Sequence, residues 1–326
     1  MSKNNEFIGI DISKDTFNIW NPEIGHLCFD NTQNGFKEFK KYLGELSWCV
    51  MEATGSYHQQ LAQYLYDKRI SVSVVNPMVI KRFIQMKLQH NKTDKSDAKM
   101  IALYAFEQSQ SLMLWEPEPK YIQECKILNT TIALYFKQST ALKNKLHSLE
   151  SKGLKGIVYY SLKRQVKHLQ DEIKVLESQI ETLIEEHEPE MLANLSTIKG
   201  IGKKTSLMLI ANTYGFKSFE TYKQVSSFFG LSPIERSSGS SIRGKSRISK
   251  KGNPLVRNHL FLCSFTACEY NPQCKALYER IVNKGKSKKL ALIAVCNKLL
   301  KQSFAVAKSG IPYDPNYRSV LKAKTI

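Results

Sequence analysis

The first 50 residues alternate between short strand-like runs and a helical stripe. The stretches 7–20 (FIGIDISKDTFNIW) and 24–29 partly alternate and are rich in Ile and Phe, which predicts a β-hairpin. Apolar residues in 35–46 then follow the 3-4-3 spacing of a helix with one buried face. A hairpin followed by an amphipathic helix therefore opens the chain.

Two further segments are predicted to be strands. The segment 47–55 (SWCVMEATG) is a short apolar run that ends in Gly55, as expected of a buried parallel strand, and 71–77 (SVSVVNP) is a further strand closed by Pro77. A helix over about 57–68 separates them. This order predicts an α/β domain with a mostly parallel sheet, and it suits an RNase-H-like fold.

The middle of the chain is patterned as long helices. An apolar stripe over 128–149 is interrupted at Gly153 and Gly156, and a stricter 4-3-4-3 series follows over 162–183. Such an a/d heptad pattern is typical of an antiparallel helical hairpin or an intermolecular coiled coil, while two helices of a local bundle would show the same spacing. Pro189 is predicted to end the second helix.

The region from residue 191 onward is predicted to be mostly helical and basic. The segment 195–211 (LSTIKGIGKKTSLMLIA) resembles a helix-hairpin-helix, because two glycines permit a tight turn whose N–H groups face a phosphate. A plain helical turn would also explain a lone GxG. The last apolar segment, 285–310, predicts an amphipathic helix that packs on the core with its lysines outward.

Composition narrows the class of protein. The 326 residues allow two or three domains, and a net charge of +19 predicts a polyanionic partner, with nucleic acid as the first candidate. Seven scattered cysteines without a CxxC pair predict packed free thiols. The chain has neither a signal peptide nor a membrane segment by pattern, so we expect a cytoplasmic location and no membrane partner.

One basic segment is set apart from the predicted core. Residues 236–257 (RSSGSSIRGKSRISKKGNPLVR) hold seven Lys and Arg and no acid. The Gly and Ser content predicts a loop, and the charge predicts a phosphate-contacting surface. A solvated basic loop without a partner is the alternative.

Two acids lie within apolar strand patterns. Asp11 is flanked by Ile10 and Ile12, so alternation points it away from those neighbours, and Glu52 ends the run WCVME. Carboxylates on neighbouring strands would repel each other unless a cation joined them. Each residue alone could instead be a solvated acid at a strand end.

A second pair of acids opens a predicted helix. Asp94 and Asp97 in KTDKSDAKMIALYA are three residues apart and share one helix face. Either could be a simple N-terminal cap. Together with Asp11 and Glu52 they form a DEDD series, and oxygen-only ligands suit Mg²⁺, with Mn²⁺ as a second candidate.

The ordered blocks GIDISKDTF, VMEATGSYHQQLAQYL, NKTDKSDAKMIALYA, GLSP, SSGSSIRGKSRISKKGNPLVRNHL and LALIAVCNKLL resemble the one-ten family of bacterial insertion-sequence transposases over nearly the whole chain. The resemblance implies a RuvC-like DEDD catalytic domain over 1–112, a coiled-coil linker over 113–190 and a C-terminal transposase domain over 191–326. It also implies that Asp11, Glu52, Asp94 and Asp97 bind the catalytic metal.

The same resemblance implies a serine nucleophile and an RNA guide. Ser238 stands directly before Gly239 at the family's Ser-Gly position, although Ser237, Ser240 and Ser241 crowd it. Expected partners are donor and target DNA, a noncoding bridge RNA and further copies of the chain, as a dimer or possibly a tetramer, in association with the nucleoid. The expected nucleic-acid contacts are Lys199, Lys203, Lys204, Arg236, Arg243, Lys245, Arg247, Lys250, Lys251 and Arg257.

Two other functions fit some of these features. A Holliday-junction endonuclease of the RuvC type would use the acids and water without the serine, and would leave free 5′-phosphate ends. A non-enzymatic nucleic-acid-binding scaffold would use the helices and the basic surface alone, and Asp11→Asn would then change no activity. The expected function is DNA cutting and rejoining by an insertion-sequence transposase.

Overall fold

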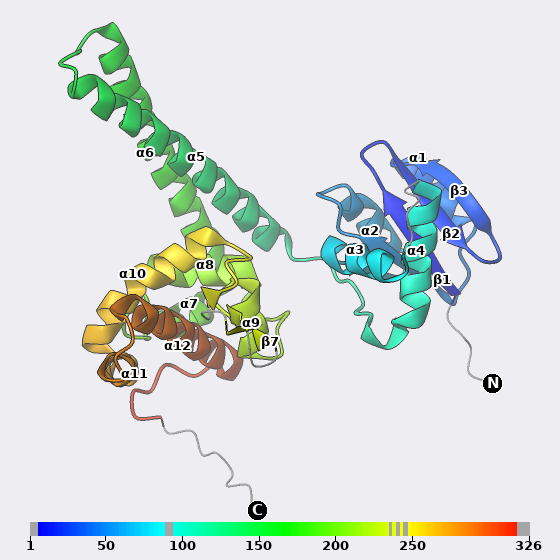
Figure 1. Cartoon of the computed structure of the whole chain (residues 1–326). Coiled ribbons are helices and arrows are strands. Elements are labelled where there is room, and N and C mark those ends of the chain that lie inside the picture. Colours follow the sequence, from blue (N-terminus) through cyan, green and yellow to red (C-terminus); the bar gives the residue numbers. More distant parts are fainter. Residues whose placement is uncertain (1–5, 89–93, 235–236, 239–241, 244–246, 318–326) are drawn as a thin grey trace, which may run out of the picture. The chain divides into compact units, whose positions relative to one another are not determined.

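A computed structural model describes residues 6–88, 94–234, 237–238, 242–243 and 247–317 (Figure 1). Of residues 94, 237–238 and 242–243 only the backbone is described. The chain divides into two compact units, Met1–Pro117 and Glu118–Ile326. The predicted division into three domains stays a prediction.

The first unit is built on a five-stranded mixed sheet in the order β3-β2-β1-β4-β5. β1 pairs antiparallel with β2 and parallel with β4, and β4 pairs parallel with β5. This topology fits the predicted RNase-H-like fold. The strands are β1 (Glu6–Ile12), β2 (Thr16–Asn21), β3 (Gly25–Asp30), β4 (Ser47–Glu52) and β5 (Ser71–Val75).

The predicted hairpin is a three-stranded meander. The stretch 7–20 breaks into β1 and β2 at Ser13, whose backbone N–H and Oγ both donate to the Thr16 carbonyl, each at 2.8 Å. Short polar side chains close turns in this way. Because the apolar character resumes at once on the far side, the pattern alone does not show the break.

Helices cover both faces of the sheet. The first core cluster joins Ile10 and Met51 to α1 (Gln33–Lys40) and α2 (His58–Asp67). On the other face, Val50 packs with α3 (Pro77–Met86) and α4 (Asp94–Glu107), and a 3₁₀ turn (Ser109–Ser111) follows. The first helix, predicted over 35–46, is shorter than predicted and begins two residues earlier. The Thr32 side chain caps it by accepting a hydrogen bond from the Gly35 backbone N–H.

The second unit begins with two long helices that form a hairpin (Figure 1). They are α5 (Lys120–Glu150) and α6 (Ile157–His187). Alternate members of the heptad series, Val166, Ile173 and Ile180, are each less than a tenth exposed. The predicted helical hairpin is thus present, whereas a coiled coil with another chain stays a prediction. α6 ends just before Pro189, as predicted, and the proline starts the next helix.

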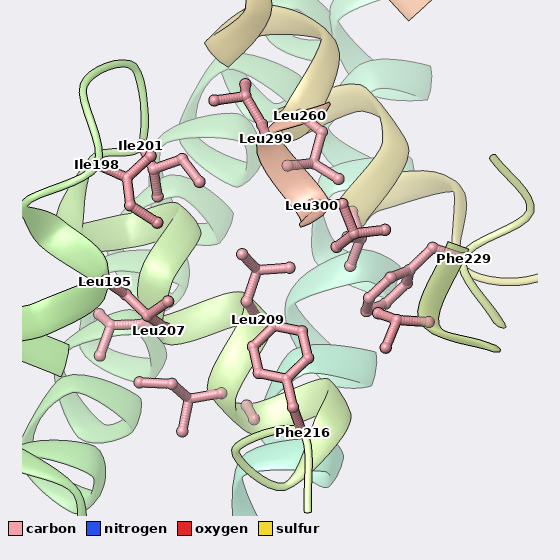
Figure 2. Close-up of a cluster of buried hydrophobic side chains, with 14 of the residues drawn as sticks. Leu195, Ile198, Ile201, Leu207, Leu209, Phe216, Phe229, Leu260, Leu299 and Leu300 are labelled. Carbon is pink, nitrogen blue, oxygen red and sulfur yellow. The ribbon is translucent and has the colours of Figure 1, made fainter. Parts of the chain in front are cut away.

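A helical core follows the hairpin. Ile201, Leu209, Phe216, Leu260 and Leu299 converge on one apolar cluster, which also receives the base of α5 and α6 (Figure 2). Its helices are α7 (Pro189–Ser196), α8 (Lys203–Thr213), α9 (Tyr222–Phe228), α10 (Pro254–Tyr270), α11 (Pro272–Asn283) and α12 (Lys288–Ser309).

The turn between α7 and α8 depends on Gly200. Its φ of +102° lies in the range that favours glycine, and a Cβ there would stand 2.6 Å from the Ala267 Cβ. The Lys199 carbonyl accepts a hydrogen bond from Asn271 Nδ2 at 3.2 Å. The turn is therefore fixed against α10 and the start of α11.

α12 is the central helix of this core. In the described part of the chain it alone has the length and apolar composition of a membrane-crossing helix, but core helices meet the same test and 44% of its most apolar window is buried. The lysines of this helix were predicted to point outward. Lys298 is an exception, because burial lowers its pKa. Most cysteines are packed thiols as predicted; burial raises the pKa of Cys296 to about 12. Cys28, on the edge strand β3, is exposed and departs from that prediction.

Candidate active site and nucleic-acid interface

Asp11 and Glu52 stand side by side in the sheet. The parallel register of β1 and β4 pairs Ile10 with Met51, so each acid follows a paired residue by one position. Since successive side chains alternate between faces, both acids lie on the face opposite to Ile10 and Met51. Both are half-buried. The sheet therefore brings together two acids that are 41 positions apart.

α4 lies against this same face. An added Cβ on Gly9 would stand 2.2 Å from the Ala98 carbonyl oxygen and 2.3 Å from the Ala102 nitrogen, so the helix backbone touches the strand. Asp97 directly precedes Ala98 and is half-buried. The acidic start of α4 is thereby held on the face that carries Asp11 and Glu52, because no other residue type at position 9 permits this approach.

The fourth acid is only partly defined. Asp94 is the first residue of α4, and its side chain lies outside the described atoms. Among the side chains that are described, no three His, Cys, Asp or Glu are close enough together to hold a metal ion. The donor set consists only of carboxylates, which suits a hard divalent cation. Metal binding by the quartet remains a prediction.

The serine-rich segment is a β-ribbon between α9 and α10. β6 (Pro233–Ile234) pairs antiparallel with β9 (Arg247–Ile248), and β7 (Ser237–Ser238) pairs with β8 (Ile242–Arg243). The predicted loop is therefore partly paired, because ladder hydrogen bonds satisfy its backbone groups. Ser238 pairs with Ile242 through the backbone. Residues 239–241, which include the Gly239, Ser240 and Ser241 positions, lie outside the described residues.

Three of the predicted nucleic-acid contacts have partners within the chain. Lys203 pairs with Glu181 and with Glu185, the latter at 2.6 Å, and the hydrogen bond to Glu181 raises the pKa of Lys203. Lys204 pairs with Glu177. Arg257 Nη1 donates to the carbonyls of Phe229 (3.0 Å) and Gly252 (3.1 Å), which ties the ribbon's end to α9.

The remaining predicted contacts differ in how far they are defined. Lys199, Arg247, Lys250 and Lys251 are exposed. Arg236 and Lys245 lie outside the described residues, and of Arg243 only the backbone is described. Exposed cations without a fixed internal role are the ones best able to meet phosphates.

The net positive charge is confined to the last part of the chain. Residues 191–326 hold 24 Lys and Arg against 5 Asp and Glu, whereas residues 1–190 hold 24 of each. A basic cluster lies at the turn between α11 and α12. The sequence predicted only that lysines lie on the outside of the last helix. Its members, Lys284, Lys286, Lys288 and Lys289, are all exposed. The run NKGKSKK was the signal that marked it.

Two family descriptions match the chain. The one described as "Transposase" for the DEDD proteins of the IS110 type covers residues 8–151, which include all four predicted acids. The other, "Transposase IS116/IS110/IS902 family", covers residues 192–279 and so includes the β-ribbon.

Relatives match over nearly their full length. A pilin gene-inverting protein of Moraxella bovis is 32% identical over 94% of this chain and 97% of its own length, and that of Moraxella lacunata is similar to the same degree. The transposase of insertion sequence IS1111A from Coxiella burnetii is 24% identical over 95% of this chain and 88% of its own. The DEDD family to which these matches point depends in general on divalent metal ions. The chain therefore belongs to the IS110 family and is a DNA transposase or recombinase.

Proposed function

We propose that the chain cuts and rejoins DNA with Ser238 as nucleophile, assisted by a divalent cation that Asp11, Glu52, Asp94 and Asp97 hold. The observation that carries this proposal is the side-by-side placement of Asp11 and Glu52 beneath the acidic start of α4. Carboxylates gathered on a half-buried face repel each other, and a bound cation would reduce that repulsion.

The acids would act by holding the cation in place. Mg²⁺, or alternatively Mn²⁺, suits a donor set of carboxylate oxygens. When bound, such an ion would neutralise charge on the phosphodiester and make a bound hydroxyl easier to deprotonate. The role of the chain would be to position the four carboxylates, whose residues belong to three separate segments, β1, β4 and α4.

The serine step is a transesterification. The Ser238 Oγ forms a bond to phosphorus, the bond from phosphorus to one deoxyribose oxygen breaks, and that oxygen leaves as a hydroxyl with the proton that the serine gives up. A hydroxyl of another strand then reverses the step, forms a new phosphodiester and restores the serine. No external energy source is required, since one phosphodiester replaces another.

The basic part of the chain would hold the nucleic acids. The names of the relatives refer to the inversion of a pilin gene and to an insertion sequence, and both processes require DNA to be cut and joined at two places. We propose donor and target DNA as substrates, a bridge RNA as guide, and a dimer or tetramer that holds two duplexes at once. Location at the nucleoid follows from these partners.

The decisive experiment is a search for a covalent protein–DNA adduct. Ser238→Ala should bind nucleic acid as the parent chain does and form no adduct, because no other group would replace the Oγ–P bond. Single Ala substitutions at Ser237, Ser240 and Ser241 are the matched controls and should keep the adduct. An adduct in Ser238→Ala would remove this residue from the role, and free 5′-phosphate ends without any adduct would favour water as nucleophile.

RNA guidance has its own test. The chain is expressed together with the noncoding DNA that flanks its gene, purified, and its bound RNA is sequenced. A discrete RNA copied from the flank is the expected result. RNA of random origin would contradict guidance while leaving the serine chemistry open to its separate test.

A further inference from the structure

A cavity lies among four helices of the second unit. α5, α6, α8 and α10 enclose a volume of about 50 Å³ that is partly open to solvent. Each water needs about 10 to 15 Å³ of such a cavity, so roughly four waters fit. Together they displace roughly 120 Å³ of liquid, about the size of one six-membered heteroaromatic ring.

The walls of the cavity are mainly apolar. Ile132 of α5, Ile180 of α6 and Leu207 of α8 contribute buried side chains, and the half-exposed Phe136 ring lies at the cavity as well. Apolar and aromatic walls favour the face of a flat ring, because stacking is insensitive to the identity of the ring. A strongly hydrated ligand would lose its water here without replacement.

Two polar groups line the same cavity. The side-chain nitrogen of Asn129 is buried and has no hydrogen-bond partner among the described residues. Burial, and then the charge of Lys204, lower the pKa of His259, so its imidazole is neutral at pH 7. An unpaired buried amide is unfavourable, and a ring with carbonyl or ring-nitrogen acceptors would satisfy it, whereas an aliphatic side chain would not.

An ion pair stands at the cavity, because Lys204 and Glu177 both line it and pair with each other. Lys204 lines the cavity, and its Nζ lies 5.8 Å from the centre of the Phe136 ring. The exposed Lys199 lies on the turn that leads into the same helix, α8. Because Lys204 is paired, the phosphates beside a base in the cavity would depend on exposed lysines such as Lys199.

We propose that this cavity binds a single unpaired nucleobase of pyrimidine size, from a DNA or RNA strand. The inference rests on the proposed nucleic-acid function and adds to it a site that recognises a base and not only the backbone. Strand exchange exposes unpaired bases, and a protein that holds one of them out of the stack would slow its re-pairing.

The test compares strands of equal charge with and without bases. The full chain is titrated against a labelled 20-nucleotide oligothymidylate and an abasic 20-mer, and we expect about tenfold tighter binding of the first, because stacking of one base on an aromatic side chain strengthens binding by about this factor. An oligouridylate of the same length shows whether RNA or DNA gives the larger preference.

Asn129→Leu is the decisive variant. It should reduce the preference for bases to less than about threefold, leave abasic binding unchanged and raise the melting temperature, since a buried amide without partner is removed. Asn258→Leu, on the exposed side of α10, is the matched control and should change none of these. Should Asn129→Leu fail to fold, His259→Leu replaces the other polar group.

The outcomes separate the two proposals. A full preference for bases in Asn129→Leu, or equal binding of both strands by the parent chain, overturns the nucleobase site alone. Failure of the parent chain to bind either strand would also contradict the proposed nucleic-acid function. Loss of the preference only in the cavity variants supports the site.

Discussion

The two units of the chain differ most in charge. Residues 1–117 hold 13 Lys and Arg and 13 Asp and Glu, whereas residues 118–326 hold 35 against 16, so the entire net charge of +19 belongs to the second unit. The first unit has instead gathered acids on one face of its sheet. The units are therefore suited to different ligands, a small cation in the first and a polyanion in the second.

Within the second unit the charge is also unevenly matched. Two helices begin with paired lysines, but those of α8 are neutralised by glutamates of α6, whereas Lys288 and Lys289 of α12 have no acid in the first turn beside them. A lysine at a helix N-terminus is unfavourable to the helix dipole. The position of a lysine in the fold, and not its presence in a basic run, therefore decides whether it is open to nucleic acid.

Removal of one strand acid should separate cutting from binding most clearly. We expect Asp11→Asn to reduce DNA cleavage by about a thousandfold, or about 4 kcal/mol, because a neutral amide is a poor ligand for a hard cation. DNA binding should be unchanged, since the neutral first unit contributes little to it. Cleavage assays and anisotropy titrations on the same preparation measure both.

The matched control is Asp15→Asn, on the exposed turn between β1 and β2 of the same sheet. It removes the same charge from the same unit and should keep full activity. Equal losses in the two variants would mean that unit charge, and not the gathered acids, matters. Unchanged cleavage in Asp11→Asn would contradict a role for this acid in cutting DNA.

A substitution at the contact between α4 and the sheet should have the next largest effect. Gly9→Ala places a Cβ against backbone atoms of α4, which cannot move aside cheaply, and we expect a loss of about 3 kcal/mol in the free energy of unfolding of the first unit. Gly44→Ala, where the nearest atom is 3.9 Å away, is the control. Urea unfolding checks both, and equal stability of the two variants would contradict the close approach.

Sequence patterns predicted the sheet well for a physical reason. The strand segments 7–12 and 47–52 are largely apolar, and the acids Asp11 and Glu52 are conspicuous within them. The gathering of those two acids followed from strand order alone. The turn at Ser13 was missed, because three polar residues between two apolar runs do not reveal whether the chain bends.

The basic surface was harder to predict because its partners are distant. Lys204 meets Glu177, 27 positions earlier, only after α6 folds back against α8. No local pattern marks such a pair, since the two residues are far beyond helical spacing. The cavity beside Asn129 is hidden for the same reason, as four separate helices form it.

The salt dependence of DNA binding should also distinguish the two units. We expect Lys288→Gln/Lys289→Gln to lower the slope of log affinity for DNA against log salt by about 2, because each phosphate contact contributes about 0.9. Lys40→Gln/Lys41→Gln removes an equally exposed pair from the first unit and should leave the slope unchanged. Equal changes would show that binding responds only to total charge.

The smallest expected effect is the pH dependence of stability that two histidines cause, one in each unit. Burial lowers the pKa of both His58 and His259 below 6.5 in the folded chain. Below pH 6.5 the unfolded chain takes up these protons and the folded chain does not, so stability falls as pH drops toward the folded values and is unaffected above 6.5. Each site contributes at most about 1.4 kcal/mol per pH unit.

The two histidines should differ in their response to salt. Lys204 lowers the pKa of His259 more than Glu177 raises it, and salt screens this net repulsion, whereas burial is the sole cause that lowers the pKa of His58. In urea unfolding between pH 7.5 and 5.5, His58→Gln should flatten the pH dependence equally at low and high salt. His259→Gln should flatten it more at low salt, and a salt-independent effect there would place Lys204 too far from the imidazole to matter.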